Sequence, residues 1–219
     1  MLWLRKNWLR LAVHLVGWLP ISWLAFDYFS HRLTVNPIQA LELRTGTYTL
    51  ILLILTLSAT PVYVLFGYSP VLKVRRTLGL YAFLYVSLHF LIFTGLDYGF
   101  DLELLKGAIF EKKYAIVGLC AGFMLLLLAV TSFKFWKIKL GKNWKRLHKM
   151  VYIAGLLAII HYIWVVKTDI RTPLVYGAVL AFLLVIRIPV VKNWVRKVRL
   201  SIRSRRLGFE PGKLAAGDR

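Results

Sequence analysis

Six long apolar runs constrain what this chain of 219 residues can fold into. A helix needs about 20 mostly apolar residues to cross a hydrocarbon core of about 30 Å. Six runs approach or meet that length: residues 11–26, 48–66, 77–96, 114–133, 150–166 and 172–191. The composition is 59% hydrophobic, far above the roughly 45–50% typical of a soluble domain. We therefore expect an all-α, polytopic membrane helical bundle with six transmembrane helices.

The basic residues predict the orientation of these helices. If the spans alternate in direction, segments 1–10, 67–76, 134–149 and 187–219 share one side, and they carry 23 of the 30 Lys and Arg residues. Lys and Arg concentrate in cytoplasmic loops. We therefore expect both termini on the cytoplasmic side (N-in/C-in), and the net charge of +21 indicates topology, with no nucleic-acid partner.

The domain organisation follows from the same pattern. Residues 1–191 form the expected six-helix membrane domain, and residues 192–219 form a basic cytoplasmic tail. Apolar residues interrupt the basic ones in the first part of the tail, which indicates a helix that leaves the membrane or lies on anionic lipid. The loops are too short to hide a folded extramembrane domain, so the chemistry must occur inside the bundle.

Histidines are the main ionisable residues within the runs. His89 and His161 lie near the ends of the third and fifth runs, roughly 10 Å and 8 Å below the same boundary at 1.5 Å per residue. Two imidazoles at matching depth on separate helices are a ligand set for the iron of a b-type haem. The alternative is that each histidine only bonds a neighbouring helix.

A second set of residues lies toward the predicted cytoplasmic side. His148 and His161 are 13 positions apart, which is about 20 Å along a straight helix, so one haem cannot use both. His148 with His14 is a candidate pair for an inner haem, although either could be a simple interfacial histidine. Arg75 and Arg76 are candidates for contact with haem propionates or a flavin phosphate, or they only fix the orientation.

Other polar residues are not assigned to a functional site. Thr45-Gly46-Thr47 lacks the flanking glycines and strand context of a nucleotide-binding loop. The single cysteine, Cys120, cannot form an internal disulfide, and we expect it to be a small buried apolar residue. His31 is expected to be an exposed loop residue.

Two segments of the chain resemble a known family. The residues that carry the resemblance are Val74-Arg75-Arg76-Thr77-Leu78-Gly79-Leu80 leading to Leu88-His89, and Leu140-Gly141-Lys142-Asn143-Trp144 leading through Leu147-His148 and Val151-Tyr152 to His161-Tyr162-Ile163-Trp164. They resemble the MsrQ family (formerly YedZ), the haem-binding membrane subunits of bacterial MsrPQ systems in the ferric reductase-like transmembrane superfamily. The resemblance covers nearly the whole chain except the tail.

This resemblance implies a function and a set of ligands. An electron-transfer subunit of the bacterial inner membrane would receive electrons from the quinone pool or a cytoplasmic flavin reductase. It would pass them through one or two b haems to MsrP, a periplasmic molybdopterin enzyme that reduces methionine sulfoxide in proteins. The implied haem ligands are His89, His148 and His161, and FMN is a further implied cofactor. Relatives have two histidines on the third helix, where Arg75 and Arg76 stand here.

Two functions of other classes remain open at this stage. The same histidines could serve as a proton relay in a small-solute or proton transporter, or the chain could be a membrane assembly factor without redox chemistry. Under the redox interpretation, the acidic segment 97–111 on the predicted periplasmic side is a candidate docking surface for the partner enzyme.

Overall fold

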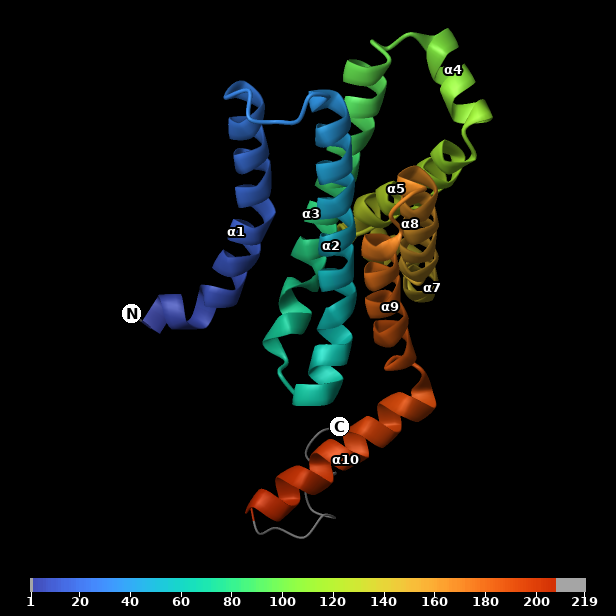
Figure 1. Cartoon of the computed structure of the whole chain (residues 1–219). Coiled ribbons are helices and arrows are strands. Elements are labelled where there is room, and N and C mark those ends of the chain that lie inside the picture. The colour runs from blue at the N-terminus through green and yellow to red at the C-terminus, as the bar shows by residue number, and fades with distance from the viewer. Residues whose placement is uncertain (1, 208–219) are drawn as a thin grey trace.

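The computed structural model describes residues 2–207, and the regular structure in that part of the chain is entirely helical (Figure 1). The elements are α1 (Leu2–Phe29), α2 (Pro37–Phe66), α3 (Pro70–Leu91), the π-helix η1 (Ile92–Asp97), α4 (Leu102–Glu111), α5 (Lys113–Val130), α6 (Lys134–Leu140), α7 (Lys142–Leu147), α8 (Met150–Val166), α9 (Arg171–Val185) and α10 (Pro189–Leu207). The all-α membrane fold expected from the sequence is confirmed. Residues 208–219 of the predicted tail lie outside the described part.

Five helical segments in the described part are long and apolar enough to cross a membrane. They are Asn7–Phe29, Pro37–Phe66, Pro70–Asp97, Lys113–Val130 and Lys142–Val166. A sixth span arises only if α9 and the first part of α10 count as one, and these two helices are bent by 76°. Helix α9 therefore ends earlier than the sixth apolar run suggested, because Pro189 lacks the backbone N–H that would continue it.

Local sequence signals set the ends of the central helix α2. Asn36 caps its start by accepting a hydrogen bond from the Gln39 backbone N–H, and Pro37 occupies the first helical position. Gly67 ends the helix in the left-handed region at φ 71°, a conformation that glycine adopts without strain. Arg199 of α10 donates to the carbonyl of Tyr63 at 2.8 Å, which holds α10 beneath the end of α2.

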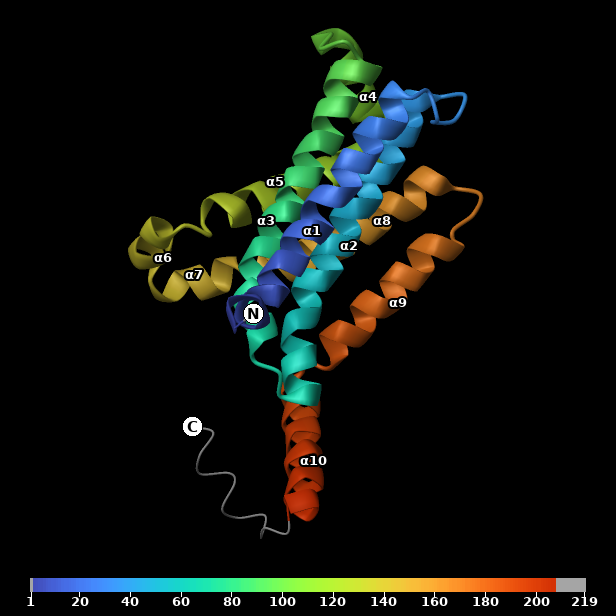
Figure 2. The same ribbon diagram turned by 90° about the vertical axis from the view of Figure 1, so that its left-hand side faces the viewer.

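Two antiparallel helix pairs form the core of the bundle. Helix α2 packs along α3, and α5 packs along α8, with α9 lying against both α8 and α2 (Figure 2). The centre is largely apolar, with Leu53 from α2, Tyr85 from α3, Ala154 from α8 and Leu180 from α9 almost completely buried. Each pair thus brings one histidine-bearing helix, α3 or α8, to the middle of the molecule.

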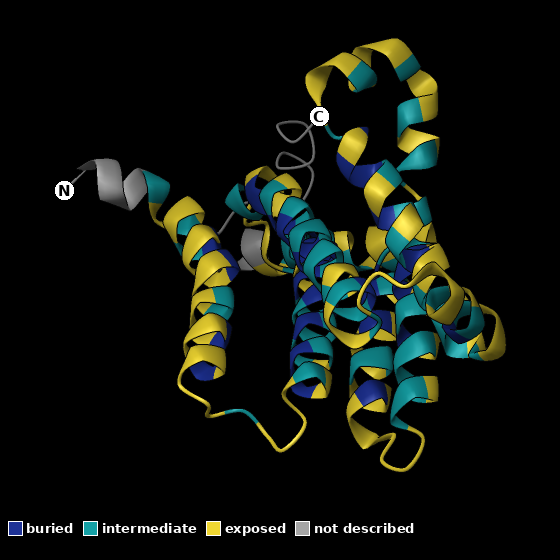
Figure 3. Ribbon diagram, turned by 90° about the horizontal axis from the view of Figure 1, so that it is seen from above, coloured by how far each residue is buried: buried dark blue, intermediate teal, exposed yellow. Residues whose placement is uncertain are grey.

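Helix α1 is one of the least buried spans in the described part of the chain. It packs mainly on α3 and shows exposed side chains over most of its surface (Figure 3). Next to this contact, residues of α1, α2 and α3 line an apolar groove of about 230 Å³. The exposed surface of α1 is rich in large apolar side chains, as expected for a helix that contacts lipid.

Candidate functional site

The structure brings His89 of α3 and His161 of α8 together. Their ring centres are 6.2 Å apart and their ring planes are nearly perpendicular, at 86°. The matching depth on two separate spans led us to expect this proximity. The two imidazoles come from different helix pairs, so their approach depends on how the two pairs pack and is not a local property of either helix.

Both imidazoles are oriented by backbone carbonyls of a neighbouring helix. His89 Nδ1 lies 3.0 Å from the carbonyl oxygen of Glu42 in α2, and His161 Nδ1 lies 2.8 Å from that of Tyr114 in α5. A carbonyl only accepts hydrogen bonds, so in each neutral ring Nδ1 carries the proton. This leaves a lone pair on each Nε2, which is the arrangement that metal-ligating histidines use.

The donor set fits haem better than a bare metal ion. No group of three or more His, Cys, Asp or Glu among the described residues could hold a metal ion. Haem iron needs only two axial ligands from the protein, because the porphyrin supplies the other four nitrogens. Two metal–imidazole bonds of about 2 Å, plus about 1 Å from each nitrogen to its ring centre, add up to about 6 Å. The observed 6.2 Å between ring centres matches that requirement.

Glu42 also places a buried polar atom on the helix that orients His89. Its backbone carbonyl is the acceptor for His89 Nδ1. Among the described residues, its carboxyl Oε1 is buried without a hydrogen-bond partner.

Sequence reasoning missed the groups that orient the two rings. The carbonyls of Glu42 and Tyr114 carry no side-chain signal, and Thr45, whose hydroxyl lies 3.4 Å from His89 Nδ1, was considered only as part of a nucleotide loop. A backbone acceptor belongs to every residue, so only the packing of α2 on α3 and of α5 on α8 identifies these two.

His148 lies in a different environment. Its ring stacks on Trp144 with centres 4.0 Å apart, and its Nε2 lies 3.2 Å from the hydroxyl of Thr131. The Trp144 indole N–H donates to the Thr131 carbonyl at 2.8 Å. His148 is therefore part of a packed corner between α5 and α7. Arg75 is exposed on α3.

The remaining candidates lie apart from the His89–His161 pair. His14 Nδ1 is 2.8 Å from the hydroxyl of Tyr81 on α3. The Arg76 guanidinium lies 5.6 Å from the ring centre of Phe133. Among the described residues, the ring contact between His89 and His161 has no counterpart that joins His14 to His148.

The predictions for Cys120 and His31 have opposite outcomes. His31 is exposed in a loop, as expected. Cys120 is also exposed, so its predicted burial is wrong. It lies on the outer surface of α5, and the bilayer can cover an apolar surface as well as a protein core does.

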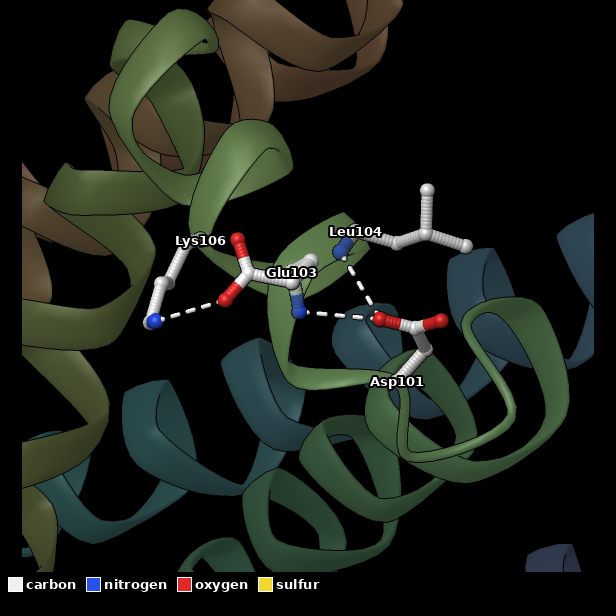
Figure 4. Close-up of polar contacts among 4 residues, drawn as sticks. All are labelled: Asp101, Glu103, Leu104 and Lys106. Carbon is white, nitrogen blue, oxygen red and sulfur yellow. Dashed lines mark hydrogen bonds and ion pairs between the residues drawn. The ribbon is translucent and has the colours of Figure 1, made fainter.

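Helix α4 projects from the end of the bundle where η1 ends, and it leads into α5 (Figure 1). Asp101 caps it by accepting hydrogen bonds from the backbone N–H groups of Glu103 and Leu104, at 2.8 and 3.1 Å (Figure 4). Glu103 pairs with Lys106 at 2.9 Å on the exposed surface. Hydrogen bonding to Tyr98 raises the pKa of Lys112 at the far end of α4. Of the acidic side chains in segment 97–111, Asp101 thus has a clear structural role, whereas Glu103 is freely accessible.

Comparisons with known proteins show the family of this chain. Residues 43–159 match the family described as "Ferric reductase like transmembrane component". The chain is 40% identical over 182 residues to the "Protein-methionine-sulfoxide reductase heme-binding subunit MsrQ" of Xanthomonas campestris pv. campestris (strain 8004), covering 80% of this chain and 83% of the relative. It is 39% identical over 186 residues to the protein of the same name from Rhodospirillum rubrum, covering 84% and 89%. No solved structure matches the chain.

Proposed function

This chain belongs to the MsrQ family of ferric reductase-like transmembrane proteins, and from that membership we propose that it is a b-type cytochrome of the bacterial inner membrane. Its curated relatives are named as haem-binding subunits of protein-methionine-sulfoxide reductase. The observation that carries the proposal is the approach of His89 and His161 from separate spans, each with Nδ1 bound to a carbonyl.

In this proposal each residue has a defined task. His89 and His161 would hold the haem through Nε2, and the carbonyls of Glu42 and Tyr114 keep the two rings from rotating. The bound haem supplies a reversible one-electron carrier, which neither the side chains nor the backbone can provide.

The direction of electron flow follows from the predicted topology. With both termini in the cytoplasm, the His89–His161 pair lies near the periplasmic face. Electrons then enter from the quinone pool or a cytoplasmic flavin reductase and leave to a soluble periplasmic partner, an MsrP-like molybdopterin reductase that acts on methionine sulfoxide. The present chain is the electron-transfer subunit of that system, and the partner catalyses the reduction.

A second haem and FMN are the remaining cofactors of the proposal. A second haem would use His148, as the family resemblance implies, with His14 as the candidate second ligand and Arg75 or Arg76 near its propionates. For FMN, which is implied by the resemblance alone, the sequence offers no phosphate-binding loop, and no step of the proposal uses it.

Haem content of the purified protein tests the proposal. The full chain should show a Soret band, and a pyridine haemochrome assay should give at least one b haem per chain. His89→Ala should lose most of this absorbance because it removes one of the two imidazoles that would hold the haem, whereas His31→Ala, a change in an exposed loop, should keep it.

The other function classes predict different results. A colourless wild-type protein that transports protons or solutes would favour the transporter. Retention of function after replacement of both His89 and His161, in variants that still fold, would favour the assembly factor. Unchanged spectra in both single variants would reject the proposed ligands.

A further inference from the structure

The two haem-ligand candidates are held by the same local arrangement, used twice. In each antiparallel pair, the first helix supplies a carbonyl and the second supplies the histidine: Glu42 of α2 with His89 of α3, and Tyr114 of α5 with His161 of α8. The separation along the chain is 47 residues in both cases. The carbonyl and the histidine of the second pair therefore lie the same number of positions after the carbonyl and the histidine of the first pair.

A glycine accompanies each carbonyl at the same offset. Gly46 follows Glu42 by four positions in α2, and Gly118 follows Tyr114 by four positions in α5. In an α-helix the residue four positions on lies directly above the carbonyl of the first. The imidazole that donates to the carbonyl must therefore pass close to the glycine.

The space at these two glycines is taken up by the histidine rings. A Cβ on Gly118 would lie 2.7 Å from both Cε1 and Nδ1 of His161, closer than side chains tolerate. A Cβ on Gly46 would lie 3.4 Å from the same two atoms of His89. In both helices the nearest atoms to the missing Cβ belong to the ligand candidate and to no other residue.

We infer that Gly46 and Gly118 are positioning residues for the haem ligands, each forming with the carbonyl four residues before it a seat for one imidazole. The inference rests on the proposed function. The carbonyl has two lone pairs, so it can accept the helical N–H and the imidazole N–H together, provided that no side chain covers it. The glycine keeps that side of the helix open, and the carbonyl then sets which ring nitrogen is free for iron.

The two seats differ in how closely the histidine ring approaches the glycine. At Gly118 an added methyl group must displace the His161 ring, which breaks the hydrogen bond from Nδ1 and turns Nε2 away from its position. At Gly46 the contact is near the limit of ordinary packing, so the His89 ring needs to move only by a few tenths of an ångström. The Gly118 substitution should therefore have the larger effect.

Helix α5 offers a matched control. Gly122 lies one turn beyond Gly118 in the same helix, and a Cβ there would meet only Val86 Cγ2 at 3.7 Å, an ordinary contact. Gly118→Ala and Gly122→Ala make the same chemical change in the same span and remove the same backbone freedom. Only the first intrudes on a histidine.

The experiment compares Gly118→Ala, Gly46→Ala and Gly122→Ala with the wild type in detergent. Loss of an outer-shell partner of a metal ligand typically costs about 10–100-fold in affinity, and we expect a haem affinity loss of that order in Gly118→Ala. The loss should be smaller in Gly46→Ala and absent in Gly122→Ala. Electron paramagnetic resonance gives a second readout, because the nearly perpendicular rings should give a strongly anisotropic low-spin signal that Gly118→Ala changes.

The outcomes separate this inference from the proposed function. A wild type without haem rejects the proposed function itself. A haem-loaded wild type whose haem affinity and resonance signal are unchanged in both Gly118→Ala and Gly46→Ala rejects the seats alone. If Gly118→Ala does not fold, two other measurements test the inference: the haem affinity of Gly46→Ala and the tautomer of His89 and His161 in the haem-free wild type. Nitrogen-15 NMR of labelled histidine should then find the proton on Nδ1 of both rings, and a proton on Nε2 overturns the inference.

Discussion

The two ends of the bundle use histidine in different ways. One end, which we call the His89 end, contains His89 and His161. Both Nδ1 atoms there are bonded to backbone carbonyls, and the ring centres are 6.2 Å apart. At the opposite end, here the α10 end, His148 directs Nε2 to a hydroxyl and His14 is bonded to Tyr81. Two features therefore distinguish the His89 end: both Nε2 atoms are left free by the bonds at Nδ1, and the two rings face each other across the bundle.

The acceptors explain the difference. At the His89 end the carbonyls receive the Nδ1 protons and leave each Nε2 free. The Thr131 hydroxyl already donates its proton to the Leu127 carbonyl at 2.6 Å, so it accepts from His148 Nε2 and occupies that nitrogen. His148 is also stacked on Trp144, which restrains the ring in a packed corner. The α10 end therefore has histidines within its packing, and the His89 end has histidines oriented for a ligand.

The largest expected effect separates His161 from His148. His161→Ala should lose the haem of the His89 end, while His148→Ala should keep it, because His148 lies outside the 6.2 Å pair. Haem per chain from a pyridine haemochrome assay, with His14→Ala alongside, measures the contrast. A colourless His148→Ala protein that still folds would contradict the assignment of the primary site to the His89 end.

A fall in haem content to a non-zero level in His148→Ala would sharpen the comparison. It would mean that the α10 end holds a second haem, for which the Thr131 hydroxyl must release His148 Nε2. The same fall in His14→Ala would identify the second ligand. A fall in His148→Ala alone would leave the other axial position to a different group.

The next effect concerns the stability of the α10 end. Pro61 has no N–H and leaves the Leu57 carbonyl in α2 without its helical partner. Arg187 donates to that carbonyl at 2.6 Å and to the Tyr152 hydroxyl at 2.8 Å. Arg187→Met should cost about 1–3 kcal/mol, because it leaves a buried carbonyl unsatisfied.

Thermal unfolding in detergent measures this cost. The exposed Lys192→Met, in the first turn of α10, is the control for loss of a positive charge. The haem spectrum of folded Arg187→Met should match that of the wild type, because the residue belongs to the α10 end. A changed spectrum at normal stability would show that the two ends are coupled, contrary to this account.

The sequence predicted the parts of this fold that depend on composition and spacing. The apolar runs predicted the spans, and the matching depth of His89 and His161 predicted their proximity. The end of α9 and the exposure of Cys120 could not be predicted in the same way. In a membrane protein both the core and the surrounding lipid are apolar. An apolar side chain is therefore stable in either place, and its hydrophobicity does not identify the buried side of the helix.

The orienting groups of the site were also beyond the sequence analysis, although a signal was present. Gly46 and Gly118 stand at the same offset before His89 and His161, a regularity that only gains meaning once α2 is seen to pack on α3 and α5 on α8. A backbone carbonyl has no residue-specific mark. The glycine that uncovers it is the only feature of the seat that a sequence records.

The smallest expected effect tests whether the His89 end also faces the soluble partner. Glu103→Lys reverses an exposed charge on α4, and electron transfer to an MsrP-like acceptor should slow at low salt and recover partly at high salt, as rim charges act mainly on association. The double change Glu103→Lys with Lys106→Glu keeps the net charge and the ion pair, and it should restore most of the rate. Asp101 is unsuitable because its carboxyl caps α4, so its replacement would unwind the helix start. A rate of partner reduction that is the same in all three proteins at low salt would remove α4 from the docking surface and leave the His89 end with ligand binding alone.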